Sequence, residues 1–209
     1  MPDVCLDGSM NLQLFASHTV DVDLMPDEPV VLDVGCRWFD FTDQVLERWR
    51  SARVIAMDPA RDVATSCHSS FIEYIQCGLV GSGPTFQRFA HFSTGEGDFI
   101  TTAEKFHDAE MYEVPTMKIK DVMQLRDVQH FDLVKLDCEG SEFGILENWP
   151  GRIATQISVE FHDWDKPHYK AANYYDKLWA RLPWYRVVQH EFSKQGEGVG
   201  HWDSLLVLR

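Results

Sequence analysis

The chain has 209 residues, 44% of them hydrophobic, which is enough for one domain with a sizeable buried core. Its formal net charge of −14 disfavours a nucleic-acid partner, because a negative field repels phosphate backbones. No stretch reaches the roughly 18 apolar residues of a membrane span, and the N-terminus has no secretory signal pattern. The five cysteines include no C-x-x-C pair. We therefore expect a cytoplasmic protein without a membrane span.

Apolar strand-like runs alternate with amphipathic helix-like runs from residue 30 onward. The expected strands are residues 30–35, 53–59, 71–80, 131–137 and 154–162. The expected helices are residues 43–51, 62–70, 141–149 and 169–182. Residues 82–92 are typical of a short hairpin arm, and residues 93–113, which contain glycines and little periodicity, of a loop. Two apolar runs flank the glycine-rich residues 193–203, which predicts an antiparallel hairpin at the end of the chain.

Repeated strand–helix units predict the α/β class, with a Rossmann-like single domain over residues 1–209 and an N-terminal extension at residues 1–29. We expect a mostly parallel seven-stranded sheet that ends in the antiparallel hairpin. Ligands of such a sheet bind beyond the carboxyl ends of its strands. Most of these strand ends carry an acid, namely Asp33, Asp58, Asp137 and Glu160. The ligand should therefore lie among carboxylates.

The loop after the first strand contains one glycine, Gly35, instead of the G-x-G-x-x-G pattern of a dinucleotide site. S-adenosylmethionine has no phosphate and carries an ammonium group, a sulfonium group and a ribose diol. Asp33 suits the ammonium group, Gly35 lets the backbone pass close to the methionine part, and Asp58 can accept both ribose hydroxyls. The alternative is that Asp33 caps the next helix and that Asp58 and Pro59 form an ordinary turn.

The segment "FDLVKLDCEGSEFGILE" (residues 131–147) resembles the hallmark I-K-I-D-x-E-G-x-E-x-x-x-L of the FkbM family of S-adenosylmethionine-dependent methyltransferases. Within residues 30–162, "LDVGCRWFDFT", "AMDPA", "VPTMKIKDVM" and "ISVEFH" are similar to further segments of that family. The chain departs from the family pattern at Phe39, which stands in place of a second glycine, and at Cys36 and Arg37, which replace Ala-Asn.

The resemblance implies a class I methyltransferase fold and methyl transfer to a hydroxyl group of a sugar, a glycan or a related small molecule. The ends of the expected strands and the motifs of the family extend the cofactor site beyond Asp33, Gly35 and Asp58. The full expected set of cofactor-binding residues is Asp33, Gly35, Cys36, Arg37, Thr42, Asp58, Pro59, Cys77, Gly78 and Asp137.

The expected catalytic residues are Asp137, Glu160 and His162, which follow neighbouring strands. Methyl transfer to a hydroxyl requires removal of its proton, and two mechanisms are open. His162 can act as the general base, oriented by Asp137. Alternatively, Asp137, Glu160 and His162 can hold Mg²⁺ or Mn²⁺, which lowers the pKa of the hydroxyl. Glu139 and Glu142 suit either the site or the turn into the next helix.

Two other functions stay open. One is a non-catalytic interaction module that has the fold without the cofactor, which the bulky Phe39 in the cofactor loop favours. The other is an NAD-dependent sugar epimerase or reductase. That enzyme needs several glycines in the loop and a Tyr-x-x-x-Lys pair, whereas Tyr174 and Lys177 are spaced differently.

Overall fold

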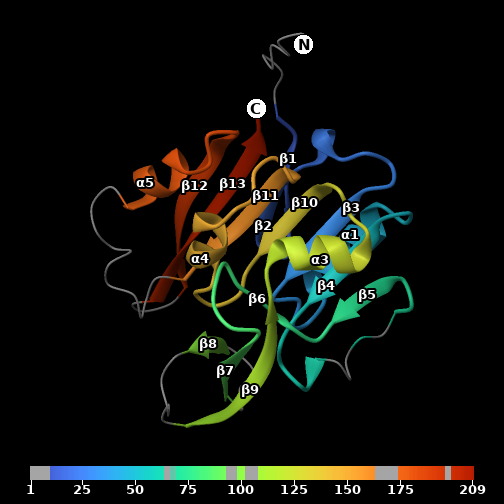
Figure 1. Cartoon of the computed structure of the whole chain (residues 1–209). Helices are drawn as coiled ribbons and strands as arrows, with labels where there is room; N and C mark the ends of the chain where they lie inside the picture. Colours follow the sequence, from blue (N-terminus) through green and yellow to red (C-terminus); the bar gives the residue numbers. More distant parts are fainter. Residues whose placement is uncertain are drawn as a thin grey trace.

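A seven-stranded sheet runs through the centre of the computed structural model, in the strand order β12-β13-β11-β10-β3-β4-β5 (Figure 1). The structure describes residues 10–63, 67, 69–92, 98–101, 108–162, 174–195 and 199–209. The strands of this sheet are β3 (Val30–Val34), β4 (Arg53–Met57), β5 (Ile72–Ile75), β10 (Phe131–Leu136), β11 (Ala154–Phe161), β12 (Tyr185–Gln195) and β13 (Val199–Leu208). Neighbouring strands from β5 to β11 are parallel, and β13 is antiparallel to both β11 and β12.

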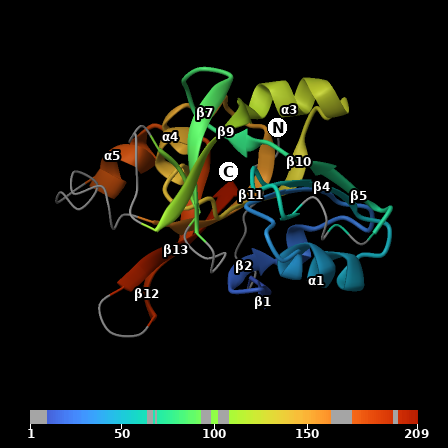
Figure 2. The same cartoon turned by 90° about the horizontal axis from the view of Figure 1, so that it is seen from below.

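Helices and a small hairpin cover both faces of this sheet. Helix α1 (Asp40–Arg48) lies on one face, and α3 (Ile119–Arg126) and α4 (Glu142–Glu147) lie on the other (Figure 2). The described part of α5 (Tyr174–Ala180) packs through Leu178 into the same core as α3 and α4. Strands that are covered on both faces must be apolar on both sides, which explains why β3 is almost completely buried.

The described residues form two further sheets, so the α/β class is confirmed but the prediction of one sheet was incomplete. A four-stranded sheet in the order β6-β9-β7-β8 lies beyond the carboxyl ends of the parallel strands (Figure 1). Its members are β6 (Gly78–Leu79), β7 (Phe86–Phe92), β8 (Phe99–Thr101) and β9 (Ala109–Met117). The second is the hairpin of β1 (Leu12–Phe15) and β2 (His18–Asp21), which is followed by the short 3-10 helix η1 (Val22–Leu24).

The loop predicted over residues 93–113 was wrong for the residues that belong to β8 and β9. Strand β9 pairs antiparallel with β7 and keeps much of its surface exposed, so it lacks the apolar alternation that marks a half-buried strand. The remaining residues of that loop, 93–97 and 102–107, lie outside the described residues, as do parts of the predicted helices 62–70 and 169–182. The antiparallel hairpin predicted at the end of the chain is present as β12 and β13.

The β1–β2 hairpin in the N-terminal extension is fastened to the central sheet. The Gln156 side chain of β11 accepts a hydrogen bond from the Asp21 backbone amide at 2.9 Å and donates one to the Asp21 carbonyl oxygen at 3.1 Å. Phe15 and Val20 pack with residues of β3, α1 and β4 in one buried cluster. These contacts fix the position of His18, the first residue of β2. Among the described helices, none combines the length and the apolar character that a membrane crossing requires.

Candidate active site

A cavity of about 260 Å³ opens where β3, β4 and β10 end. Of the ten residues expected to bind the cofactor, all except Thr42 line it. Of the three expected catalytic residues, Asp137 lines it, whereas Glu160 and His162 lie behind it at the end of β11. Parallel strands that end at one edge of a sheet bring their terminal residues together, which is why residues so far apart in the sequence share this cavity.

The loop after β3 is held close to the loop after β10. Gly35 has φ +77°, a left-handed conformation, and its amide donates to the Met57 carbonyl oxygen at 2.8 Å. A Cβ atom at this position would overlap the carbonyl oxygen of Asp137. Both the conformation and the close approach therefore require glycine here.

Phe39 also has a left-handed conformation, with φ +61°, and immediately precedes α1. Its side chain is 1% exposed and packs edge-on against Tyr74 at a ring distance of 6.0 Å. The ring is thus part of a buried cluster that also contains Ile72 and Phe89, and it forms part of the cavity wall. The left-handed backbone at position 39 would suit glycine, but the buried Phe39 side chain occupies it.

A buried lysine connects the two cofactor loops. Lys135 Nζ donates to the Gly35 carbonyl oxygen at 2.6 Å and lies 3.2 Å from Asp33 Oδ1 and 3.5 Å from Asp137 Oδ2. Although burial lowers the pKa of Lys135, the Asp33 and Asp137 carboxylates outweigh it and raise this pKa above the usual value. Thr42 lies behind Asp33 and donates to its Oδ2 at 2.7 Å. Thr42 therefore holds Asp33 in place without lining the cavity.

Asp58 lies at the end of β4 and is 5% exposed. Burial raises its pKa from the usual 3.8 to about 6, against the hydrogen bond that its Oδ1 accepts from the Ala60 amide at 2.8 Å. The carboxylate is thus costly to keep ionised, because burial outweighs the attraction of the more distant Arg37 and Lys135 cations. Such a group is suited to accept hydrogen bonds from a ligand.

The guanidinium of Arg37 is engaged by two carboxylates. Its terminal nitrogens donate to Asp98 Oδ2 and to Asp62 Oδ2, both at 2.8 Å. Asp98 also accepts a hydrogen bond from the Phe92 backbone amide at 2.7 Å, beside the four-stranded sheet. Arg37 therefore joins the loop after β3 to this sheet and lines the cavity with a side chain whose charge is already paired.

His162 lies in a ring of carboxylates. Its Nδ1 is 3.2 Å from Glu142 Oε1, and its Nε2 is 3.3 Å from Glu160 Oε1 and 3.5 Å from Glu139 Oε2. Burial lowers the pKa of His162, but the hydrogen bonds to Glu142 and Glu160 outweigh burial and raise this pKa well above 6.5. Both ring nitrogens of His162 face acids, an arrangement that favours the protonated imidazole.

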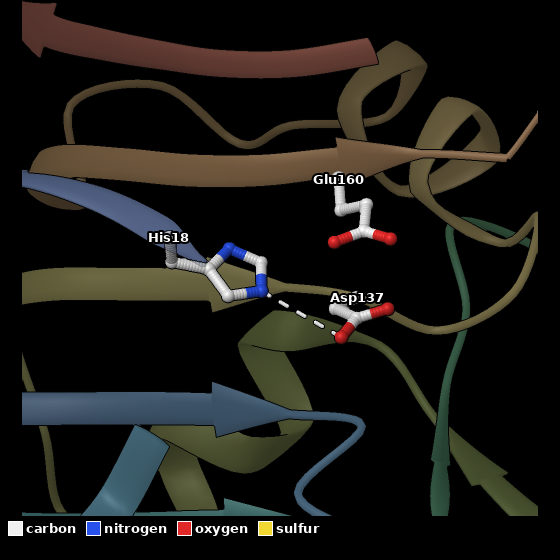
Figure 3. Close-up of side chains that lie close together, drawn as sticks. All are labelled: His18, Asp137 and Glu160. Atoms are coloured by element: carbon white, nitrogen blue, oxygen red, sulfur yellow. Dashed lines mark ion pairs between the residues drawn. The ribbon is translucent and has the colours of Figure 1, made fainter. Parts of the chain in front are cut away.

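One further histidine reaches the site from outside the predicted set. His18 of β2 is 3% exposed, lines the cavity and points its Nε2 toward Asp137 Oδ2 at 3.6 Å, with Glu160 nearby (Figure 3). No pattern around "SHTVD" distinguishes it, because its position depends on how the hairpin packs. Lys135 was also missed, although a lysine between the apolar residues Val134 and Leu136 was a visible signal.

Several side chains here could hold a metal ion. Three groups of three residues each place one potential ligand atom per residue within 4.8 Å of the other two, and the first group shares a residue with each of the others. They are His18, Asp137 and Glu160; Asp137, Glu139 and His162; and Glu160, His201 and Asp203. The predicted ligands Asp137, Glu160 and His162 are distributed over these groups.

The chain is similar in sequence to known methyltransferases. The family model described as "Methyltransferase FkbM domain" matches residues 27–186. Methyltransferase sdnD of Sordaria araneosa is 22% identical over 189 residues, covering 71% of this chain and 72% of that protein.

Two solved structures share the fold. Methyltransferase FkbM from Methylobacillus flagellatus KT has a TM-score of 0.50 and 13% identity, over 88% of this chain and 44% of that one. TrmK from M. capricolum, in complex with S-adenosyl-homocysteine, has a TM-score of 0.50 and 10% identity, over 90% of this chain and 65% of that one. The chain thus spans less than two thirds of the length of either structure.

Proposed function

Because this chain belongs to the FkbM methyltransferase family, we propose that it transfers a methyl group from S-adenosylmethionine to a hydroxyl group of a sugar, a glycan or a related small molecule. One observation carries the proposal. The cavity at the strand ends joins a glycine loop and buried carboxylates on one side to a cluster of acids and histidines on the other.

The cavity suits this cofactor by the chemistry of its walls. When bound, S-adenosylmethionine supplies a methyl group activated by a positively charged sulfur. Asp33 and Asp137 provide negative charge toward the ammonium and sulfonium ends, and Lys135 fixes both carboxylates. Asp58, whose buried carboxylate has a raised pKa, accepts the ribose hydroxyls. Asp33 and Asp137, beside the glycine loop, would repel the pyrophosphate of NAD, which argues against the dinucleotide alternative.

Carboxylates on the acceptor side of the cavity remove the proton of the acceptor hydroxyl. The hydroxyl oxygen forms the new bond to the methyl carbon, the carbon–sulfur bond leaves its electron pair on sulfur, and the hydroxyl proton passes to a carboxylate. Asp137 and Glu160 are the proposed catalytic pair, Glu160 as the proton acceptor or both as oxygen ligands of Mg²⁺ or Mn²⁺. Burial raises the pKa of Asp137, but the Lys135 cation and two neighbouring histidines together outweigh burial and keep this pKa well below the usual value, so Asp137 is a poor proton acceptor. His162 is proposed as a positioning residue rather than the base or a ligand, because its nitrogens face Glu142 and Glu160.

Isothermal titration with S-adenosylhomocysteine and with NAD tests the cofactor. We expect S-adenosylhomocysteine to bind and NAD not to bind. Transfer of a labelled methyl group to a panel of sugars, glycans and other alcohols then tests the reaction. Binding of NAD alone would support the alternative of an NAD-dependent sugar epimerase or reductase. If neither ligand binds, the alternative of a non-catalytic module is supported, the function that Phe39 in the cofactor loop favours.

A further inference from the structure

We propose that the N-terminal hairpin completes a divalent-metal site in which His18 Nε2, Asp137 and Glu160 bind one ion beside the cavity. The role of the ion, to lower the pKa of the acceptor hydroxyl, rests on the proposed methyl transfer. Its binding can be measured independently of that reaction. His18 lies outside residues 27–186, so this ligand comes from a part of the chain that the family match does not cover.

The imidazole of His18 is held in one orientation. Its ring packs edge-on against Phe41 of α1, with ring centres 5.7 Å apart, and its Nδ1 lies 3.4 Å from the Ser158 hydroxyl. The hydrogen bonds between Gln156 and the Asp21 backbone fasten the strand that carries it. A histidine whose Nδ1 is occupied in this way presents Nε2 alone to a ligand, which is the usual arrangement of a metal-bound imidazole.

The free nitrogen of this imidazole faces carboxylates. Nε2 is buried and has no hydrogen-bond partner among the described residues, although it lies 3.6 Å from Asp137 Oδ2. Figure 3 shows the His18, Asp137 and Glu160 side chains converging from three different strand ends. Two donors that are each about 2.1 Å from one ion lie about 3.0–3.5 Å apart. Small side-chain rotations would therefore bring the three donors to a shared ion.

Local charge favours a cation at this point. The carboxylates of Asp137, Glu139 and Glu160 gather around His162, and Glu142 faces its other nitrogen. These four acids outnumber the two cations beside them, His162 and Lys135. Glu160 Oε1 is occupied by His162 and His201, at 3.3 and 3.2 Å, so this histidine pair fixes the carboxylate that would bind the ion. An imidazole nitrogen with two carboxylates suits Mn²⁺ better than Mg²⁺, which prefers oxygen ligands and retained waters.

Titration of Mn²⁺ into the metal-stripped full chain, followed by electron paramagnetic resonance, tests the site. Wild-type protein should bind one Mn²⁺, and His18→Gln should weaken that affinity at least about tenfold. Mg²⁺ affinity should change less. Glu160→Gln should weaken Mn²⁺ binding similarly, which tests the site independently if His18→Gln does not fold. The matched control is His130→Gln: His130 precedes β10, at the opposite end of the strand, and bonds to Thr155 Oγ1 at 2.9 Å.

The same samples should be titrated with S-adenosylhomocysteine and followed by thermal melting. An absence of Mn²⁺ binding to wild-type protein, or Mn²⁺ binding equal in wild type and His18→Gln, would overturn the metal site. If Mn²⁺ binding depends on His18 but S-adenosylhomocysteine does not bind, the site stands and the proposed function fails. If both bind and His130→Gln behaves as wild type, both proposals are supported.

Discussion

Replacing Asp58 with asparagine should stabilise the folded protein and weaken the cofactor complex. The two side chains have nearly the same shape, and the carbonyl oxygen of the new side-chain amide can keep the hydrogen bond from the Ala60 amide. What changes is the buried negative charge. Stability and affinity should therefore move in opposite directions, which a general disruption of the fold would not produce.

The magnitude follows from the pKa of Asp58, which burial raises from 3.8 to about 6. At neutral pH, where Asp58 is ionised, that difference lowers the free energy of unfolding by about 3 kcal/mol. Burying the asparagine amide also costs free energy, although less than burying a charge. We therefore expect Asp58→Asn to raise the free energy of unfolding by about 1–3 kcal/mol above pH 6. Between pH 4 and 6 the folded wild type binds more protons than the unfolded chain, so its stability falls as pH rises through this window. The advantage of the variant should shrink as pH falls through 6 and vanish below about 4.

Urea denaturation at a series of pH values measures the change in stability, and titration with S-adenosylhomocysteine at pH 7.5 measures the change in affinity. The loss of a charge-assisted hydrogen bond to the ribose should weaken affinity about tenfold or more. A variant that is less stable than wild type at neutral pH would refute the assignment of a costly buried charge. Unchanged affinity in a folded variant would refute the ribose contact.

Substitutions at three further positions test the packing of the cofactor loops, each by urea denaturation. Phe39→Ala should lower the free energy of unfolding by about 3–5 kcal/mol, because the buried ring is lost. Phe39→Gly should lower it by about 1 kcal/mol less, because glycine adopts the left-handed conformation freely. A glycine variant less stable than the alanine variant would contradict this account. Lys135→Met should cost about 3–5 kcal/mol, because it leaves Asp33 buried without its cation. Thr42→Val should cost about 1–3 kcal/mol by removing the hydrogen bond to Asp33, and no loss would mean that solvent replaces it.

The cofactor side of the cavity could be predicted from the sequence because its geometry is local. A buried parallel strand ends where its apolar run ends, so the residue after it lies at the carboxyl edge of the sheet. Asp58 and Asp137 follow β4 and β10 directly, as this rule predicts, whereas Asp33 is the last residue but one of β3; all three line the cavity. Thr42 is two residues into α1 and faces Asp33 from behind, a distinction that depends on how the helix is rotated.

The acceptor side could not be predicted in the same way, because its contacts are long-range. His18 reaches Asp137 only after β2 has packed on β11, and the hydrogen bonds that hold β2 there join Asp21 and Gln156, which are 135 positions apart in the sequence. Strand β9 was missed for a related reason, since a strand with an exposed face shows no strong alternation. The role of His162 also depended on structure, because Glu142 and Glu160 approach it from different elements.

The two sides of the cavity also differ in where their residues come from. The residues proposed to bind the cofactor lie within the segment 27–186 that matches the family, whereas His18 and His201 flank it at either end. Both histidines act on the same carboxylate region, His18 at Asp137 and His201 at Glu160. Under the proposed function, the flanking segments would therefore act mainly on the acceptor side, and on the cofactor side only through Asp137, which His18 contacts. Substitutions at His18 should accordingly weaken metal binding and turnover more than they weaken affinity for S-adenosylhomocysteine.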